Sequence, residues 1–278
     1  MRANTFSAMM LVLLITIPVF GYTDSSQNVI EQKGDGSINW SRGVIRAKGI
    51  GIPPKVVSGD TNARSEALAN AEFDAFHKIF EIAKEVRIDG DTVVGNTALL
   101  NNAILLKIEN MAKNAKVVRK EYLTDGTVKI GMEMSLFGGF AQLVLPKEIK
   151  PLDSITPVNM NKTSQQMFTG LVVDTRGLDI RPAMVPKIID ENGQEVYGSA
   201  FVSREYAVQR GMSGYGKDLE KIVHNRRVAD HPLVVKGLKA VGSSRSVIVI
   251  SNTDASRLRS FSESLSFLKK CRVMIVVD

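Results

Sequence analysis

The chain has 278 residues, of which 44% are hydrophobic and 23% are charged. This composition is typical of a folded globular protein and excludes a disordered or fibrous chain. The formal net charge is +7, but the basic residues are scattered and no basic run is interleaved with aromatic residues. We therefore expect no nucleic-acid-binding groove.

The N-terminal residues have the pattern of an export signal. Arg2 precedes an apolar run that ends at Phe20, and the short residues Val19 and Gly21 occupy the positions that a signal peptidase inspects. We predict a signal peptide over residues 1–21, cleaved after Gly21, and hence a periplasmic protein. The apolar run is shorter than the ~20 residues of a spanning helix, so we expect no transmembrane span in the mature chain.

Cysteine usage limits the covalent chemistry of the chain. Cys271 is the single cysteine, so no internal disulfide can form. It lies in a strand-like apolar run and far from the cleavage region, which predicts a buried small side chain and not an acylated or reactive thiol.

The first domain is predicted from changes of hydrophobic period. Residues 22–37 are polar and lack periodicity, which predicts a flexible leader before an ordered domain over residues 38–145. The run from Gly43 to Gly51 alternates as a strand does and is stopped by two prolines. From Asn62 the apolar residues recur three or four apart as far as Val86, which predicts a long helix.

A second helix and a hairpin complete this domain. An apolar stripe predicts a helix over about Thr97 to Lys113. Two alternating runs, Ala115 to Tyr122 and Thr127 to Leu136, flank an Asp-Gly pair that suits a tight turn. The predicted fold class is α+β: an antiparallel sheet with two helices on one face, followed by a second α/β domain.

A series of short motifs follows in order along residues 38–145. They are Gly49-Ile50-Gly51 with Pro53-Pro54, Ala63-Arg64, Val86-Arg87-Ile88-Asp89-Gly90, Lys116-Val117-Val118, Asp125-Gly126-Thr127-Val128 and Gly138-Gly139. The series resembles the small envelope domain of the membrane-associated 20-kDa lipoprotein antigen (LPP20-type) family. A related domain opens the flagellar T-ring protein FlgT. The resemblance implies a periplasmic or outer-membrane-associated module without known catalysis. This chain lacks the acylated N-terminal cysteine of the lipoprotein members.

The proline-containing, polar residues 146–168 predict a linker to a C-terminal α/β domain over residues 169–278. In that domain the apolar runs predict strands and helices in alternation. The last elements, a strand over residues 246–251, a helix over 254–269 and a strand over 272–277, predict a crossover unit with parallel strands.

No set of catalytic residues is evident. The glycine-containing run from Arg210 to Gly216 lacks the lysine and hydroxyl ending of a phosphate-binding loop, which favours a mobile surface loop. His77, His224 and His231 match no metal-binding or hydrolase pattern. We therefore predict no enzyme activity, no catalytic residues, no metal site and no cofactor.

Three functional hypotheses follow. The first is a non-catalytic periplasmic binding or assembly module whose partners are other envelope proteins, cell-wall or outer-membrane components, or a second copy of the chain. The second is a receptor or enzyme for a small anionic ligand, in which the basic C-terminal domain supplies Arg204, Arg210, Arg226 and Arg227. The third, a component of the flagellar basal body, rests on the family resemblance.

Overall fold

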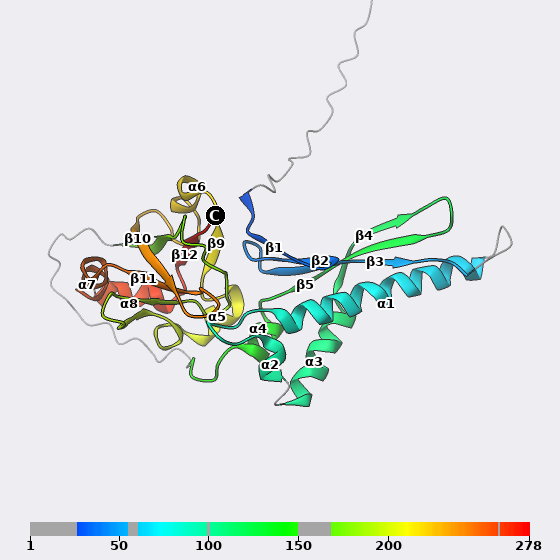
Figure 1. The fold of residues 1–278 in the computed structure, drawn as a ribbon, viewed down its shortest axis with the longest axis horizontal. Coiled ribbons are helices and arrows are strands. Elements are labelled where there is room, and N and C mark those ends of the chain that lie inside the picture. Colours follow the sequence, from blue (N-terminus) through cyan, green and yellow to red (C-terminus); the bar gives the residue numbers. More distant parts are fainter. Residues whose placement is uncertain (1–26, 55–60, 99–100, 150–167, 261) are drawn as a thin grey trace, which may run out of the picture.

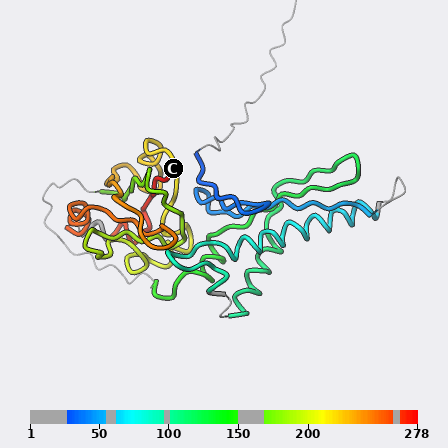
Figure 2. Tube along the Cα trace, viewed as in Figure 1, coloured from blue at the N-terminus to red at the C-terminus, as the bar shows by residue number. Residues whose placement is uncertain are grey.

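The computed structural model describes residues 27–54, 61–98, 101–149, 168–260 and 262–278. The predicted signal peptide and most of the predicted linker lie outside these residues. The described chain forms an antiparallel five-stranded sheet with helices, followed by a mixed seven-stranded sheet with helices (Figure 1). This arrangement confirms the predicted α+β class. The two parts lie side by side along the long axis of the molecule (Figure 2).

The first sheet has the order β1-β2-β3-β5-β4. Its strands are β1 (Ile30–Lys33), β2 (Gly36–Asn39), β3 (Val44–Gly51), β4 (Lys116–Tyr122) and β5 (Val128–Ser135). The predicted β4–β5 hairpin is confirmed, with Gly126 in its turn at a φ of 84°. Every neighbouring pair in this sheet is antiparallel.

Among the described residues, the first part of the chain contains the helices α1 (Thr61–Glu85), α2 (Val94–Ala98), α3 (Asn102–Lys113) and α4 (Gly139–Val144). The long helix is confirmed as α1. The predicted second helix is wrong at its N-terminal end, because Asn101 takes an extended conformation and caps a separate α3 by accepting a hydrogen bond from the amide of Ala103.

The residues predicted as a flexible leader contain ordered structure. Residues 30–33 and 36–39 form the β1–β2 hairpin, which pairs with β3. Gly34, at a φ of 52°, supplies the left-handed residue of its two-residue turn. Strands of four residues are too short to show a convincing period, and the hairpin is ordered because Ile38 packs into the core with no exposed surface.

Helix α1 lies directly on the backbone of β3. A Cβ atom at Gly49 would lie 1.9 Å from the carbonyl oxygen of Ala71, and one at Gly51 would lie 1.8 Å from that of Ala67. Ala67 and Ala71 are themselves fully buried. The small residues of both elements therefore permit a helix-to-sheet distance that any larger side chain would prevent.

The second sheet has the order β8-β7-β11-β10-β6-β12-β9. Its strands are β6 (Gly170–Asp174), β7 (Lys187–Ile189), β8 (Glu195–Tyr197), β9 (Gly214–Gly216), β10 (Pro232–Val241), β11 (Val247–Ile250) and β12 (Val273–Val276). Its helices are the 3-10 turn η2 (Ser199–Phe201), α5 (Arg204–Arg210), α6 (Leu219–Val223), α7 (Asn252–Ser260) and α8 (Ser262–Lys269).

Two predictions for this part are wrong. Strand β11 does not pair with β12: it forms an antiparallel pair with β10, and β10 and β6 lie between the two. The short connection after β10, with Gly242 at a φ of 84°, closes a local hairpin instead. The predicted mobile loop from Arg210 to Gly216 is mostly buried, and its end forms the edge strand β9 beside β12.

Most buried apolar residues of both sheets form one cluster, which includes residues from Val29 to Val277. The two parts of the chain therefore share an apolar contact as well as polar ones. A second, smaller cluster lies within the second part and consists of Val172, Ile222, Val228, Met274 and Val276. Within the described ranges, no helix combines the length and the apolar composition that spanning a membrane requires.

Replacing Gly49 by alanine tests the close contact of α1 with β3. Gly49→Ala should lower the free energy of unfolding by about 2 kcal/mol or more, because the added methyl group displaces the helix backbone. Urea denaturation measures the change. Gly90→Ala is the matched control, since a Cβ atom there has no neighbour nearer than 3.6 Å. Equal effects of the two substitutions would contradict the packing argument.

Candidate functional site

Two of the predicted anion-binding arginines donate to backbone carbonyl groups. Arg204 donates to the carbonyl oxygens of Pro146 (2.8 Å) and Gln142 (3.1 Å), and so ties α5 to the end of α4. Arg210 donates to the carbonyl of Lys270 and lies over the ring of Tyr206, 5.1 Å from its centroid. Both guanidinium groups therefore hold segments of the fold together.

The other two predicted arginines differ sharply. Arg227 is half-buried and donates to the carbonyl oxygens of Cys271 (2.9 Å), Gly211 (3.1 Å) and Arg210. Burial lowers the pKa of the Arg227 guanidinium below its ordinary value. Arg226 is exposed on the adjacent turn. The structure thus does not gather the four arginines into one open cluster, and Arg227 has a structural role.

The cysteine and the histidines of the second part have structural roles. Cys271 is buried as expected, and burial raises the pKa of its thiol to about 11, so it is protonated at neutral pH. His231 stacks on Phe168 with 5.8 Å between ring centroids, and the backbone amide of His224 caps α6. In the described part of the chain, no group of three or more His, Cys, Asp or Glu residues is placed to hold a metal ion.

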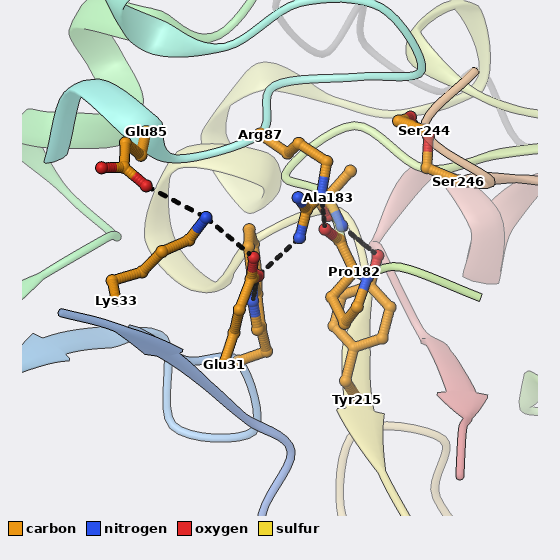
Figure 3. A network of polar contacts seen from close by, with 10 residues as sticks. Glu31, Lys33, Glu85, Arg87, Pro182, Ala183, Tyr215, Ser244 and Ser246 are labelled. Atoms are coloured by element: carbon orange, nitrogen blue, oxygen red, sulfur yellow. Dashed lines mark hydrogen bonds and ion pairs between the residues drawn. The ribbon is translucent and has the colours of Figure 1, made fainter. Parts of the chain in front are cut away.

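The junction of the two parts is organised around Arg87, which follows α1 (Figure 3). Its guanidinium donates to Glu31 of β1 and, over 2.9 Å, to the carbonyl of Pro182 in the second part. Lys33 bridges Glu31 (3.2 Å) and Glu85 (3.1 Å). The guanidinium group of Arg87 therefore contacts both parts of the chain.

Aromatic residues close this network into a ring of contacts. The indole nitrogen of Trp40 donates to Glu31 over 3.0 Å, and its ring meets the edge of Tyr215 at a centroid distance of 6.0 Å. The Tyr215 hydroxyl donates to the carbonyl of Ala183 over 2.8 Å and accepts from the amide of the same residue. Ala183 follows Pro182, the residue that Arg87 contacts. Arg87 and Tyr215 therefore hold the same short segment of the second part.

Backbone hydrogen bonds add to the junction. The amides of Met184 and Val185 donate to the carbonyls of Arg87 (3.0 Å) and Ile88 (2.7 Å). At a second point, the amide of Gly138 donates to the carbonyl of Val208 over 2.8 Å. Backbone contacts of this kind fix the relative orientation of two domains, because they tolerate little displacement.

The face of the five-stranded sheet turned away from α1 is the candidate binding surface. We call it the open face. The β-sheet register places on it the exposed or half-exposed residues of alternate strand positions: Arg46, Lys48 and Ile50 of β3, Lys129, Gly131 and Glu133 of β5, and Lys116, Arg119 and Glu121 of β4. Basic side chains outnumber acidic ones on this surface.

A concave region of about 730 Å³, which we call the hollow, extends from the β1–β2 turn, where the ion pair of Asp35 and Lys78 lines it, onto the open face. Its lining includes Ser37, Lys48, Ile50, Val118, Arg119 and Gly131. Val118 is the extra residue of a β-bulge between Val117 and Arg119, and it is 48% exposed. Bulges redirect side chains out of the regular alternation, and this one brings an aliphatic side chain of β4 to the rim of the hollow. Ile50, also 48% exposed, lines the rim on β3, with β5 between the two residues.

Side chains of α1 satisfy the part of β3 that extends beyond β2. Asp74 accepts from the amide of Ile50 over 2.9 Å, and Lys78 donates to the carbonyl of Lys48 over 3.2 Å. Lys78 also pairs with Asp74 and with Asp35 of the β1–β2 turn. This portion of the edge is therefore protected from pairing with another strand, and the open face is left as the accessible surface.

The sequence did not single out this surface. The alternation of Arg46, Lys48 and Ile50 predicted a strand, but it did not indicate which side a helix covers. The available signal was the pair Gly49 and Gly51 on the opposite side: two glycines at alternate strand positions indicate close approach by another backbone. The side chains that alternate with these glycines along β3 must then point away from the helix.

The fold and its surfaces define a two-part α+β protein. A search of curated proteins finds no match. Residues 170–278, less than half of the chain, match the protein family described as Treponema pallidum Tp0624, second domain. The second part of this chain is therefore similar to that domain, and the boundaries of the match agree with the start of β6 and the end of the chain.

Protonation of Glu31 should weaken the junction. Burial acts to raise the pKa of Glu31, but the hydrogen bond from Trp40 and the charges of Arg87 and Lys33 outweigh it, so the pKa is lowered from 4.5. The unfolded chain then binds the proton first, and the stabilisation is present above pH 4.5 and lost as the pH falls through the lower folded-state pKa.

Urea denaturation between pH 7 and pH 3 measures this effect. Glu31→Gln should cost about 1 to 2 kcal/mol at neutral pH, and the difference from wild type should shrink below about pH 4.5. Glu81→Gln, at a half-exposed surface pair with Lys84, is the control and should change little at any pH. A constant difference for Glu31→Gln would contradict the assigned role of its charge.

Arginine substitution separates a structural from a ligand-binding role. Arg227→Met should lower the free energy of unfolding by about 2 to 4 kcal/mol, because the carbonyls of Arg210, Gly211 and Cys271 lose their donors. Arg226→Met, at the exposed neighbour, should change it by less than about 0.5 kcal/mol. Thermal and urea unfolding of both variants provide the comparison, and similar small effects would refute the structural role.

Proposed function

We propose that this protein is a non-catalytic binding or assembly module of the bacterial cell envelope, which acts through the open face of its first domain. The observation that carries the proposal is an accessible sheet face with a hollow that is lined by cations and by two half-exposed aliphatic side chains. Exposed apolar side chains grouped on one surface favour an interaction site. The predicted export signal and the resemblance to the lipoprotein antigen family support the location.

The junction supports a role in assembly. It joins the two parts by ion pairs, aromatic contacts and backbone hydrogen bonds, so a partner bound on the open face would be held in a defined orientation to the second part. The half-buried and internally bonded state of Arg227 weighs against the alternative of a small-anion receptor built on the C-terminal arginines. The flagellar alternative has the family resemblance as its sole support.

Site-specific crosslinking in intact cells tests the proposed function. A photoreactive residue at Ile50, on the open face, should give a discrete crosslinked product in the envelope fraction. The same residue at Leu238, which is similarly exposed on the second sheet, is the matched control and should give much less of that product. The proposal fails if the protein is recovered from the cytosol with its first residues attached, or if the two positions crosslink alike.

A further inference from the structure

We propose that the hollow binds an acidic, extended segment of a partner protein, with one carboxylate over Gly131 between Lys48 and Arg119. This inference rests on the proposed binding function and adds the chemistry of the partner. Three observations support it: the register of three strands, the incomplete neutralisation of Lys48 and Arg119, and the apolar rim of the hollow.

The register places the three residues in one row across the sheet. Lys48 of β3 is paired with Gly131 of β5, and Gly131 is paired with Arg119 of β4. Adjacent strands lie about 4.8 Å apart, so the two cationic residues are about 10 Å apart at their Cα atoms. The glycine between them has no side chain, which leaves space for a carboxylate that both long side chains can reach.

The space above Gly131 is open, and the side chains of Arg119 and Val118 lie close to it. A Cβ atom at Gly131 would lie 3.3 Å from the Cβ of Arg119 and 3.6 Å from a methyl carbon of Val118. A larger residue at this position would therefore fill the space between the cations.

The charges of the row are incompletely neutralised. In the described ranges, Lys48 forms no ion pair, whereas Arg46 in the next row is paired with Glu133 over 2.6 Å. Arg119 pairs with Glu121 of its own strand, and its side chain is 75% exposed. A carboxylate above Gly131 would add a charge-assisted contact to each cation, and such contacts are stronger than hydrogen bonds between neutral groups.

The apolar rim favours a peptide over a free anion. Ile50 lies two residues from Lys48 on the same face of β3, and Val118 adjoins Arg119 on β4. In an extended peptide, residues two apart also point to the same side and lie about 7 Å apart. An acidic residue above Gly131 therefore brings an aliphatic residue two positions away within reach of this rim.

Other macromolecular occupants fit less well. A second copy of the open face would bring Lys48, Lys116 and Lys129 against like charges, which disfavours symmetric self-association. A bilayer surface would contact the rim, but it cannot follow a concave floor formed by a glycine. We therefore assign the hollow to a peptide and treat binding to anionic lipid as an outcome that opposes the assignment.

Fluorescence anisotropy with a labelled peptide of Glu-Ser-Val-Ser repeats, in which Glu and Val lie two residues apart on one side of an extended chain, tests the site on the purified protein. The peptide with glutamine in place of glutamate is the ligand control and should bind at least tenfold more weakly (~1.4 kcal/mol). Lys48→Glu should weaken binding of the Glu-Ser-Val-Ser peptide by about tenfold or more. Lys239→Glu, the same charge reversal on the exposed part of β10, should weaken it by less than about twofold.

A second variant tests the shape of the site without changing its charge. Gly131→Val should weaken binding by a similar factor because it fills the floor, and valine is favourable in a strand. Urea denaturation of each variant verifies folding. The assignment is overturned if Lys48→Glu and Lys239→Glu weaken binding equally, if Gly131→Val has no effect in a folded protein, or if the wild type binds anionic phospholipid vesicles and not the peptide.

The crosslinking and peptide experiments test the binding function and the acidic-peptide assignment separately. If crosslinking at Ile50 succeeds while the charge and glycine substitutions leave peptide binding unchanged, the binding function stands and the acidic-peptide assignment falls. If the peptide binds as expected but the protein is cytosolic, the site stands and the envelope function falls.

Discussion

The contact of Arg87 with both halves of the molecule is the constraint on which the rest of the structure depends. The residue follows α1, pairs with Glu31 of the first sheet and donates to Pro182 of the second part. Because its side chain is only 12% exposed, an unpaired charge there would be costly. The interaction therefore joins the end of the long helix, the β1–β2 hairpin and the connection between β6 and β7 in one arrangement.

The asymmetry of the first sheet follows from the packing of α1. Gly49 and Gly51 allow the helix to lie against the backbone of β3, and the residues that alternate with them must point to the other side. Asp74 and Lys78 then satisfy the part of β3 that β2 does not cover. One set of contacts thus covers one face, protects part of an edge and leaves a cationic face with a glycine floor accessible to a partner.

The elements predicted correctly have a strong local signal. The long helix shows a sustained helical period, and the β4–β5 hairpin combines alternation with an Asp-Gly turn. The β1–β2 hairpin was missed because each strand has four residues, too few to show a period. The predicted parallel pair failed because strand order depends on contacts distant in sequence, and β6 and β10 lie between β11 and β12. The candidate arginines show the same limit: composition identified basic residues, but their neighbours decided which of them donate to carbonyl groups.

By itself, the sequence determined the α+β class, the long helix, the β4–β5 hairpin and the burial of Cys271. These depend on periodicity, turn residues and polarity, which are local properties. The tertiary structure decided the strand order of the second sheet, the role of Arg227, the junction around Arg87 and the row formed by Lys48, Gly131 and Arg119. Each of these joins residues that are distant along the chain. Their proximity results from sheet register and domain packing, which no single segment encodes.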